Sequence, residues 1–409
     1  MLNRIRSLVA YVVLLITIVT LGGSVFADDE MKIKMPMAKA PPGAIISDPT
    51  SVVMIVNRDS NDIAFMDIKT RKIVGKVFLG NNVNPHMVMM SPDGRYVVTG
   101  GTRANKAYII DVATLKLVKT IPVGIGPEHL AFSPDGRYYY QGNPDGDSIT
   151  VIDMVSLTAI KTIEGLVEPL NITFTPDGSK AYVGNYGAHW VGVIDVKRHE
   201  LLKKIQIAEV PGIAKLDPSR YLGEIKGVSN ATPSSDGRYL YVADSDLSVV
   251  GVIDTRTDKV IKVIRVGKGP WRVYMSHDGN YAITVNNGDQ TISIIDTRTN
   301  TVAATHEAGA TMTGVNYAAG KAFVISAPGF VYVYNMQTLK PAGRIKIGSN
   351  IQIETATTDT ANDKLYLADS TDHSIIVIDG KTEAIERVNN VGLFPWGTHI
   401  MDSKDNYCH

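Results

Sequence analysis

The sequence predicts an all-β fold built from eight copies of one unit of four short strands. The main observation is a strand that ends in a Val-Ile-Asp-like triplet and recurs eight times along the 409 residues. Successive copies are 39 to 44 residues apart, except for one interval of 59, and no helical periodicity lies between them. A strand repeat of this length is typical of a β-propeller. The eight triplets end at Asp67, Asp111, Asp153, Asp195, Asp254, Asp296, Asn335 and Asp379.

The third copy shows the unit most clearly. The segment Ser133-Pro134-Asp135-Gly136 separates its first two predicted strands, and Asn143-Pro144-Asp145-Gly146-Asp147 separates the second from the third. Proline presets the backbone of such a turn, aspartate bonds its own backbone, and glycine supplies the positive φ. We therefore expect the four strands of this unit at residues 127–132, 138–142, 148–153 and 159–163.

The two ends of the chain indicate how the ring closes. The first copy, residues 48–80, lacks the inner strand with which the other copies open, and residues 394–401 have the pattern of that missing strand. We expect this C-terminal strand to join the N-terminal blade, which leaves no open sheet edge. One triplet per blade gives eight blades. Seven is the alternative, because it is the commoner number for repeats of this kind.

The N-terminal segment predicts export. Arg4 and Arg6 precede an uncharged run over residues 7–27, which ends in small residues before Asp28. This order is typical of a secretory signal peptide, although an uncleaved anchor is an alternative because residues 8–21 are strongly apolar. We expect a signal peptide at 1–27, an extension at 28–47, the propeller at 48–403 and a tail at 404–409. The expected location is the periplasm or an equivalent lumen, with no membrane contact after cleavage.

Charge and cysteine content narrow the possible partners. Loss of Arg4 and Arg6 with the signal peptide leaves 39 basic residues against 41 acidic ones, so the mature chain has a net charge near −2. Without a basic excess or a strip of aromatic and basic residues, nucleic acid is excluded as the expected partner. The single cysteine, Cys408, leaves no internal disulfide to form.

Four large rings are predicted to face the central channel. His86, Trp271 and Trp396 each follow a proline at the start of an inner strand, and His129 lies two places after Pro127. Inner strands of a propeller line its channel, so these side chains are expected to cluster around one mouth. Two interpretations stay open: a pocket for a ligand or cofactor walled by Trp and His, or rings that only fill the channel. The sequence assigns none of them as a metal ligand.

The interval of 59 residues contains an insertion of roughly seventeen residues within 208–229. It leaves the fourth blade between its outer strand and the next inner strand, and it mixes apolar with charged side chains. Long excursions from a regular repeat are usually functional, so we predict a surface that docks on a partner; the alternative is a loop packed on its own protein. The predicted contact residues are Pro211, Ile213, Leu216, Arg220, Tyr221 and Leu222.

The chain carries none of the short motifs of nucleophilic, metalloprotease or phosphate-binding chemistry. A pair of carboxylates from distant blades stays an alternative, because propellers assemble such pairs across the ring. We therefore predict no catalytic residue in this chain and leave open whether it acts as an enzyme.

Two sequence patterns recur in the predicted strands. The clearest examples are Tyr239-Leu240-Tyr241-Val242-Ala243, Val252-Ile253-Asp254-Thr255-Arg256-Thr257 and Ile294-Ile295-Asp296-Thr297-Arg298-Thr299. These segments resemble the YVTN-type β-propeller family, and the resemblance covers residues 48–403. Members of this family include surface-layer proteins, haem-handling periplasmic proteins and subunits of redox complexes. Within it the chain most resembles the β subunits of hydrazine synthase, in its overall strand sequences, its predicted export and its fourth-blade insertion.

This resemblance implies a non-catalytic propeller subunit, with seven blades, of a periplasmic redox complex that joins nitric oxide and ammonium into hydrazine in nitrogen metabolism. It implies no cofactor in this chain, haem in partner subunits, haem-bearing proteins as partners and the anammoxosome of anammox organisms as the location. A second resemblance, to eight-bladed propellers that hold a modified haem in nitrite reductase and its maturation proteins, implies a haem-binding enzyme or carrier. There His86 or His129 would be the axial ligand. A cell-surface interaction propeller is the third alternative.

Overall fold

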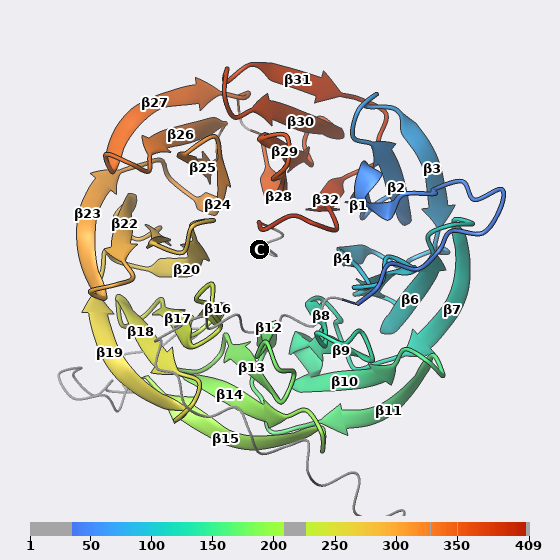
Figure 1. The fold of residues 1–409 in the computed structure, drawn as a ribbon, viewed down its shortest axis with the longest axis horizontal. Helices are drawn as coiled ribbons and strands as arrows, with labels where there is room; N and C mark the ends of the chain where they lie inside the picture. The colour runs from blue at the N-terminus through green and yellow to red at the C-terminus, as the bar shows by residue number, and fades with distance from the viewer. Residues whose placement is uncertain (1–34, 208–225, 328, 350, 406–409) are drawn as a thin grey trace, which may run out of the picture. The chain divides into compact units, whose positions relative to one another are not determined.

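Eight antiparallel sheets of four strands each surround a common axis (Figure 1). The structure is a computed structural model that describes residues 35–207, 226–327, 329–349 and 351–405. In these residues the predicted eight-bladed β-propeller is confirmed, and the alternative of seven blades is wrong.

The first four blades are numbered in chain order. Blade 1 contains β1 (Val52–Asn57), β2 (Asp62–Asp67), β3 (Ile73–Phe78) and the last strand of the chain, β32 (Pro395–His399). Blade 2 contains β4 (Pro85–Met90), β5 (Tyr96–Gly101), β6 (Lys106–Asp111) and β7 (Lys116–Pro122). Blade 3 contains β8 (Leu130–Phe132), β9 (Tyr138–Asn143), β10 (Ser148–Asp153) and β11 (Thr158–Ile163). Blade 4 contains β12 (Pro169–Phe174), β13 (Lys180–Asn185), β14 (Trp190–Asp195) and β15 (Glu200–Gln206).

The other four blades repeat this order. Blade 5 contains β16 (Thr232–Pro233), β17 (Tyr239–Asp244), β18 (Val249–Asp254) and β19 (Lys259–Arg265). Blade 6 contains β20 (Pro270–Met275), β21 (Tyr281–Asn286), β22 (Thr291–Asp296) and β23 (Thr301–Glu307). Blade 7 contains β24 (Met312–Ala318), β25 (Lys321–Ser326), β26 (Phe330–Asn335) and β27 (Lys340–Lys346). Blade 8 contains β28 (Ile353–Asp359), β29 (Lys364–Asp369), β30 (Ser374–Asp379) and β31 (Ile385–Val388), and the short 3-10 helices are η1 (Pro49–Ser51) and η2 (Pro144–Gly146).

Each predicted triplet residue is the last residue of a strand, and its side chain explains why the strand stops there. The Asp67 carboxylate accepts a hydrogen bond from the backbone N–H of Thr70 at 2.7 Å, and Asp111 accepts one from Thr114 at 2.9 Å. An aspartate that caps the following turn competes with continued strand pairing. The repeat therefore sets the strand ends locally.

The C-terminal strand closes the ring as predicted. β32 pairs antiparallel with β1, with Met54 opposite His399 and Val56 opposite Gly397. In Figure 1 the red β32 lies beside the blue β1. Both ends of the propeller thus share one sheet, so unfolding of the ring must separate them.

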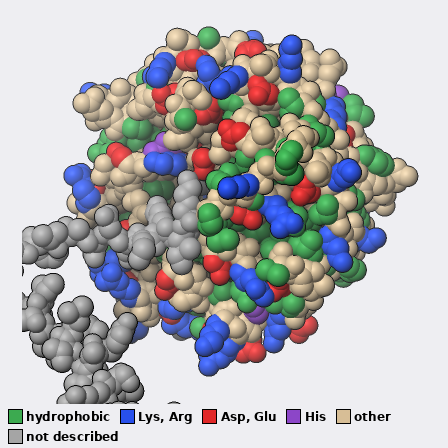
Figure 2. All heavy atoms as spheres, turned by 45° about the vertical axis from the view of Figure 1, so that its right-hand side comes forward, with side chains coloured by type: hydrophobic (Ala, Val, Ile, Leu, Met, Phe, Trp, Pro, Cys, Tyr) green, Lys and Arg blue, Asp and Glu red, His purple; other side chains and the backbone are tan. Residues whose placement is uncertain are grey.

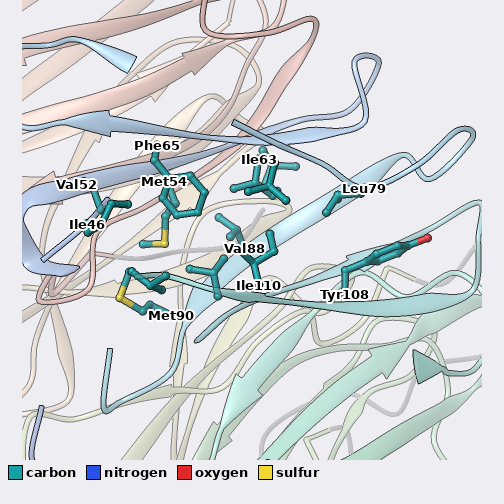
Figure 3. Packing of buried hydrophobic residues seen from close by; sticks show 14 of the residues in the cluster. Ile46, Val52, Met54, Ile63, Phe65, Leu79, Val88, Met90, Tyr108 and Ile110 are labelled. Atoms are coloured by element: carbon teal, nitrogen blue, oxygen red, sulfur yellow. The ribbon is translucent and has the colours of Figure 1, made fainter. Parts of the chain in front are cut away.

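The core lies between neighbouring blades. One cluster joins blades 1 and 2, where Phe65 and Met54 of blade 1 face Val88 and Ile110 of blade 2 (Figure 3). Inner and middle strands are covered on both faces and read as nearly continuous apolar runs, whereas the outer strand β7 is exposed at all but one position. Exposure therefore increases from the inner to the outer strand of a blade, because each sheet is packed between two others.

Polar side chains also join successive blades. Tyr140 of blade 3 bonds His199 of blade 4 at 2.7 Å, and Tyr241 of blade 5 donates to Asn300 of blade 6 at 2.7 Å. His199 and Asn300 occupy the same turn position with φ of 55° and 52°, respectively. A tyrosine on the second strand therefore fastens the last turn of the next blade.

Three further observations complete the fold. The inner strand of blade 3 begins at Leu130 rather than at residue 127 as predicted, because Glu128 and His129 form a bulge opposite Gly142. Among the described residues no helix is long and apolar enough to cross a membrane. Basic and acidic side chains are interspersed on the face that Figure 2 shows, which is typical of a solvated surface.

Candidate binding site at the channel mouth

A cavity of about 600 Å³ lies where the inner strands begin. Its walls come from blades on opposite sides of the ring, so it spans the centre of the propeller. A volume of this size is in the range of small-molecule and cofactor sites. The residues that line it include the four predicted rings His86, His129, Trp271 and Trp396, together with Arg58, Glu128, Glu168, Tyr186 and Glu354.

The structure brings three of the four predicted rings into direct contact. The His86 ring centroid is 5.2 Å from that of Trp396 and 6.1 Å from that of His129. Trp271 lies in another part of the wall, edge-on to Tyr186 at 5.4 Å. The cavity thus has an aromatic wall contributed by blades 1, 2, 3, 4 and 6.

A β-bulge at the start of several inner strands aims these rings. In β4 the register shifts between Pro85 and Val88, around His86, and a matching shift in β20 falls around Trp271. A bulge places two residues opposite one and re-aims their side chains. Proline is tolerated at these positions because it begins the strand.

His86 is a buried, neutral imidazole. Only 4% of its surface is exposed, and its Nδ1 has no hydrogen-bond partner. Burial lowers the pKa of His86 to about 3, and the positive charges of Arg58 and Arg272 add to this effect. At neutral pH the ring is therefore uncharged, and one of its nitrogens keeps a lone pair.

Two arginines bring positive charge to the cavity. The Arg58 guanidinium lies over the Trp396 ring, 4.1 Å from its centroid, and donates two hydrogen bonds to Asn84 Oδ1. Arg272 is only 2% exposed and lies 5.2 Å from the centroid of the Trp271 ring. Stacking of a guanidinium on an aromatic face leaves its edge free for an acceptor.

Acidic groups at the mouth hold protons more tightly than usual. Burial, followed by the charge of Asp145, raises the pKa of Glu128 to about 7, although Arg58 and Arg272 oppose the shift. Burial also raises the pKa of Glu354. A carboxyl group that titrates near neutral pH can accept or donate a proton at the cavity.

Sequence reasoning missed Arg58, Glu128, Arg272 and Glu354. Arg272 offered a usable signal, since it is a charged residue inside a predicted inner strand. The predicted contact residues of the insertion, Pro211, Ile213, Leu216, Arg220, Tyr221 and Leu222, lie outside the described residues. In the part of the chain that the structure describes, no three His, Cys, Asp or Glu side chains are placed to hold a metal ion.

Comparisons with known proteins identify the fold in two consecutive segments. The family described as "Lactonase, 7-bladed beta-propeller" matches residues 80–214, and the family described as "Cytochrome D1 heme domain" matches residues 227–374. A sequence search of the curated proteins gives no match.

Several solved structures are similar to this chain. Dihydro-haem d1 dehydrogenase NirN in complex with DHE has a TM-score of 0.70 at 18% identity, covering 90% of this chain and 78% of that chain. A functionally unknown protein from Desulfotomaculum acetoxidans has a TM-score of 0.58 at 12% identity, covering 86% and 98%. Hydrazine synthase from Kuenenia stuttgartiensis has a TM-score of 0.49 at 21% identity, covering 74% and 78%. The chain is therefore a β-propeller with eight blades, whose successive segments match the lactonase-type and cytochrome d1-type propeller families.

Proposed function

We propose that this chain is a propeller of haem-dependent redox metabolism whose channel mouth binds a tetrapyrrole. The observation that carries the proposal is His86, a buried neutral imidazole with an unpartnered nitrogen, placed against Trp396 in a cavity that also contains Arg58. The match of residues 227–374 to the cytochrome d1 haem domain supports it, as does the likeness to a propeller described in complex with DHE.

The donor set of the cavity fits such a group. His86 would hold the metal of such a group through a ring nitrogen, and Trp271 and Trp396 would pack against the group. Arg58 and Arg272 would face carboxylate side chains, since guanidinium groups match carboxylate geometry. A bound haem would supply one-electron redox chemistry.

The residues of this chain have separate tasks in the proposal. Burial keeps His86 neutral, so its lone pair is available across the whole physiological pH range. Glu128, with its pKa near 7, would hold or release a proton beside the ligand. The aromatic wall would keep water from the bound ring.

The first test is the visible absorbance of the mature protein, titrated with hemin. We expect a new absorbance band with wild type and its loss in His86→Ala, whereas His373→Ala, an exposed histidine, serves as the matched control. His129→Ala tests the second candidate ligand. A protein that stays colourless from a haem-replete host and gives no band with hemin overturns the proposal.

The role expected from the sequence is the second candidate: a non-catalytic subunit without its own cofactor, beside haem-bearing partners, in the periplasm or an anammoxosome-type lumen. The insertion in blade 4 and the signal-like N-terminal segment support it. Its test is the native mass of the protein isolated from its own organism. Deletion of residues 210–224 is expected to keep the fold and lose the partners. A native mass of one chain contradicts this role.

A further inference from the structure

Arg272 is a buried cation with unsatisfied donors. It lies on β20 immediately after Trp271, is 2% exposed, and its Nε and one terminal nitrogen have no hydrogen-bond partner. Its guanidinium lies over the face of the Trp271 ring. Burial of a guanidinium without a partner is costly, because the lost hydration is not replaced.

The neighbouring carboxyl group does not neutralise this charge fully. Arg272 acts on Glu128, but burial and Asp145 outweigh it and keep Glu128 partly protonated at neutral pH. Among the described residues no carboxylate forms an ion pair with Arg272 within 4 Å. The guanidinium therefore lacks the counter-charge that buried arginines normally have.

A second cation acts on the same region. The charges of Arg58 and Arg272 both act on His86, one from blade 1 and the other from blade 6. Arg58 has an acceptor in Asn84, whereas Arg272 keeps two free donors. Two positive charges thus act on one buried ring, and their combined field attracts an anion toward the cavity.

We propose that Arg272 binds a small carboxylate or similar oxyanion beside the channel-mouth cavity. The planar fork of the guanidinium would donate hydrogen bonds to two oxygens of such a group while its face rests on Trp271. The oxyanion is a free anion or an acidic side chain of the bound tetrapyrrole. Only the second source rests on the function proposed above.

The free anion is tested with formate, by calorimetry and tryptophan fluorescence on the mature chain at constant ionic strength. We expect saturable binding to wild type and at least about tenfold weaker binding to Arg272→Met. Arg344→Gln is the matched control, because Arg344 also stacks on an aromatic ring, Phe330, but is exposed. This arm contains no haem, so it is independent of the haem proposal.

The second source is tested with metal-free mesoporphyrin and its dimethyl ester. Suppose that formate does not bind. If wild type then binds the free acid more tightly than the ester, and Arg272→Met binds both equally, the oxyanion is a carboxylate of the tetrapyrrole. If neither ligand depends on Arg272, the proposal is wrong.

Thermal unfolding separates a binding role from a structural one. Because Arg272→Met removes an unpaired buried charge, we expect a higher Tm than wild type in buffer free of small carboxylates. A lower Tm together with unchanged binding would mean that the guanidinium serves only the fold, and would overturn the proposal.

Discussion

The Arg58 guanidinium lies 4.1 Å from the centroid of the Trp396 ring, across the seam where the two ends of the propeller share blade 1. Arg58 directly follows β1, and Trp396 belongs to β32. The same indole is 5.2 Å from the His86 ring in the cavity wall. The Trp396 side chain therefore contacts both the seam where the ring closes and the wall of the candidate site.

The pair is testable by a double-mutant cycle. Arg58→Met and Trp396→Leu are expected to show a coupling energy of about 1 kcal/mol in urea unfolding, which is the size of a partly buried cation–π contact. The control cycle combines Arg58→Met with Trp190→Leu, whose cation neighbour is Lys204. Equal coupling in both cycles would show that the contact at the seam contributes nothing specific.

His86 makes stability depend on acid pH. Burial lowers its pKa from about 6.5 to about 3 in the folded chain, so the unfolded chain binds more protons between these values. Its contribution is present above pH 6.5 and is lost as pH falls toward 3, by on the order of 4 kcal/mol. Urea unfolding of His86→Gln at pH 7 and pH 4 should show a smaller difference than wild type. An unchanged difference argues that the ring is not buried neutral.

His399, at the end of β32, should act in the same direction. Burial lowers its pKa to about 3 as well, without help from a neighbouring charge. Its stabilising contribution is likewise lost between pH 6.5 and 3. Because His399 belongs to the closing strand, proteolysis after acid treatment should cut first near the C-terminus. Cleavage that begins elsewhere would contradict this.

The contribution of Glu128 to stability changes with pH in the opposite direction to that of His86. Its pKa is raised from about 4.5 to about 7, so its contribution is full below pH 4.5 and is lost as pH rises through 7. Glu128→Gln is expected to be about 1 kcal/mol more stable than wild type at pH 8, after allowance for its partial exposure, and equal to it near pH 4. Glu164→Gln, on the exposed surface, is the control and should not change the profile.

The contact between blades 4 and 5 is charged, whereas the contacts between blades 3 and 4 and between blades 5 and 6 are neutral. The Tyr182 hydroxyl donates to Asp258, which also accepts from Lys180 at 2.9 Å. Tyr182→Phe should cost about 2 kcal/mol of unfolding free energy, against about 1 kcal/mol for Tyr241→Phe, whose acceptor is an amide. Thermal unfolding of the two variants makes the comparison. Equal losses would mean that the charge adds no stability.

Asp405 ties the C-terminal tail to the propeller. Its buried carboxylate accepts hydrogen bonds from Tyr317 N and Thr358 Oγ1 at 2.8 Å and from His277 Nε2 at 2.9 Å. Asp405→Asn should lose about 2 kcal/mol and release the tail to limited proteolysis, since at least one bond must break. Lys404→Gln, exposed and adjacent, should behave as wild type. If the tail of Asp405→Asn resists proteolysis as well as that of wild type, the hydrogen bonds of Asp405 do not hold it.

The strands of the blades were predictable from the sequence because their ends depend on local side-chain interactions. The predicted ends at Asp67, Asp111 and the six other triplets coincide with strand ends, because each aspartate or asparagine side chain acts within its own turn. The closing strand near Trp396 was also predictable, since the first copy lacked an inner strand. The start of β8 was misplaced by three residues, because a bulge at Glu128 and His129 depends on the paired strand. In the same blade, β9 ends one residue later and β11 begins one residue earlier than predicted.

The sequence alone determined the repeat and the rings that follow the prolines, since each of these is encoded within about 40 residues. It favoured eight blades over seven, and the structure decided between the two numbers. Tertiary structure decided which side chains meet. Arg58, His86 and Glu128 come from three different blades and line one cavity, and the charge of Arg272 from a fourth blade acts on His86 and Glu128. These residues converge only once the ring has closed. Bulge geometry, burial and the sum of neighbouring charges then set the protonation of His86 and Glu128. None of these quantities exists before blades that are far apart in the sequence share one cavity.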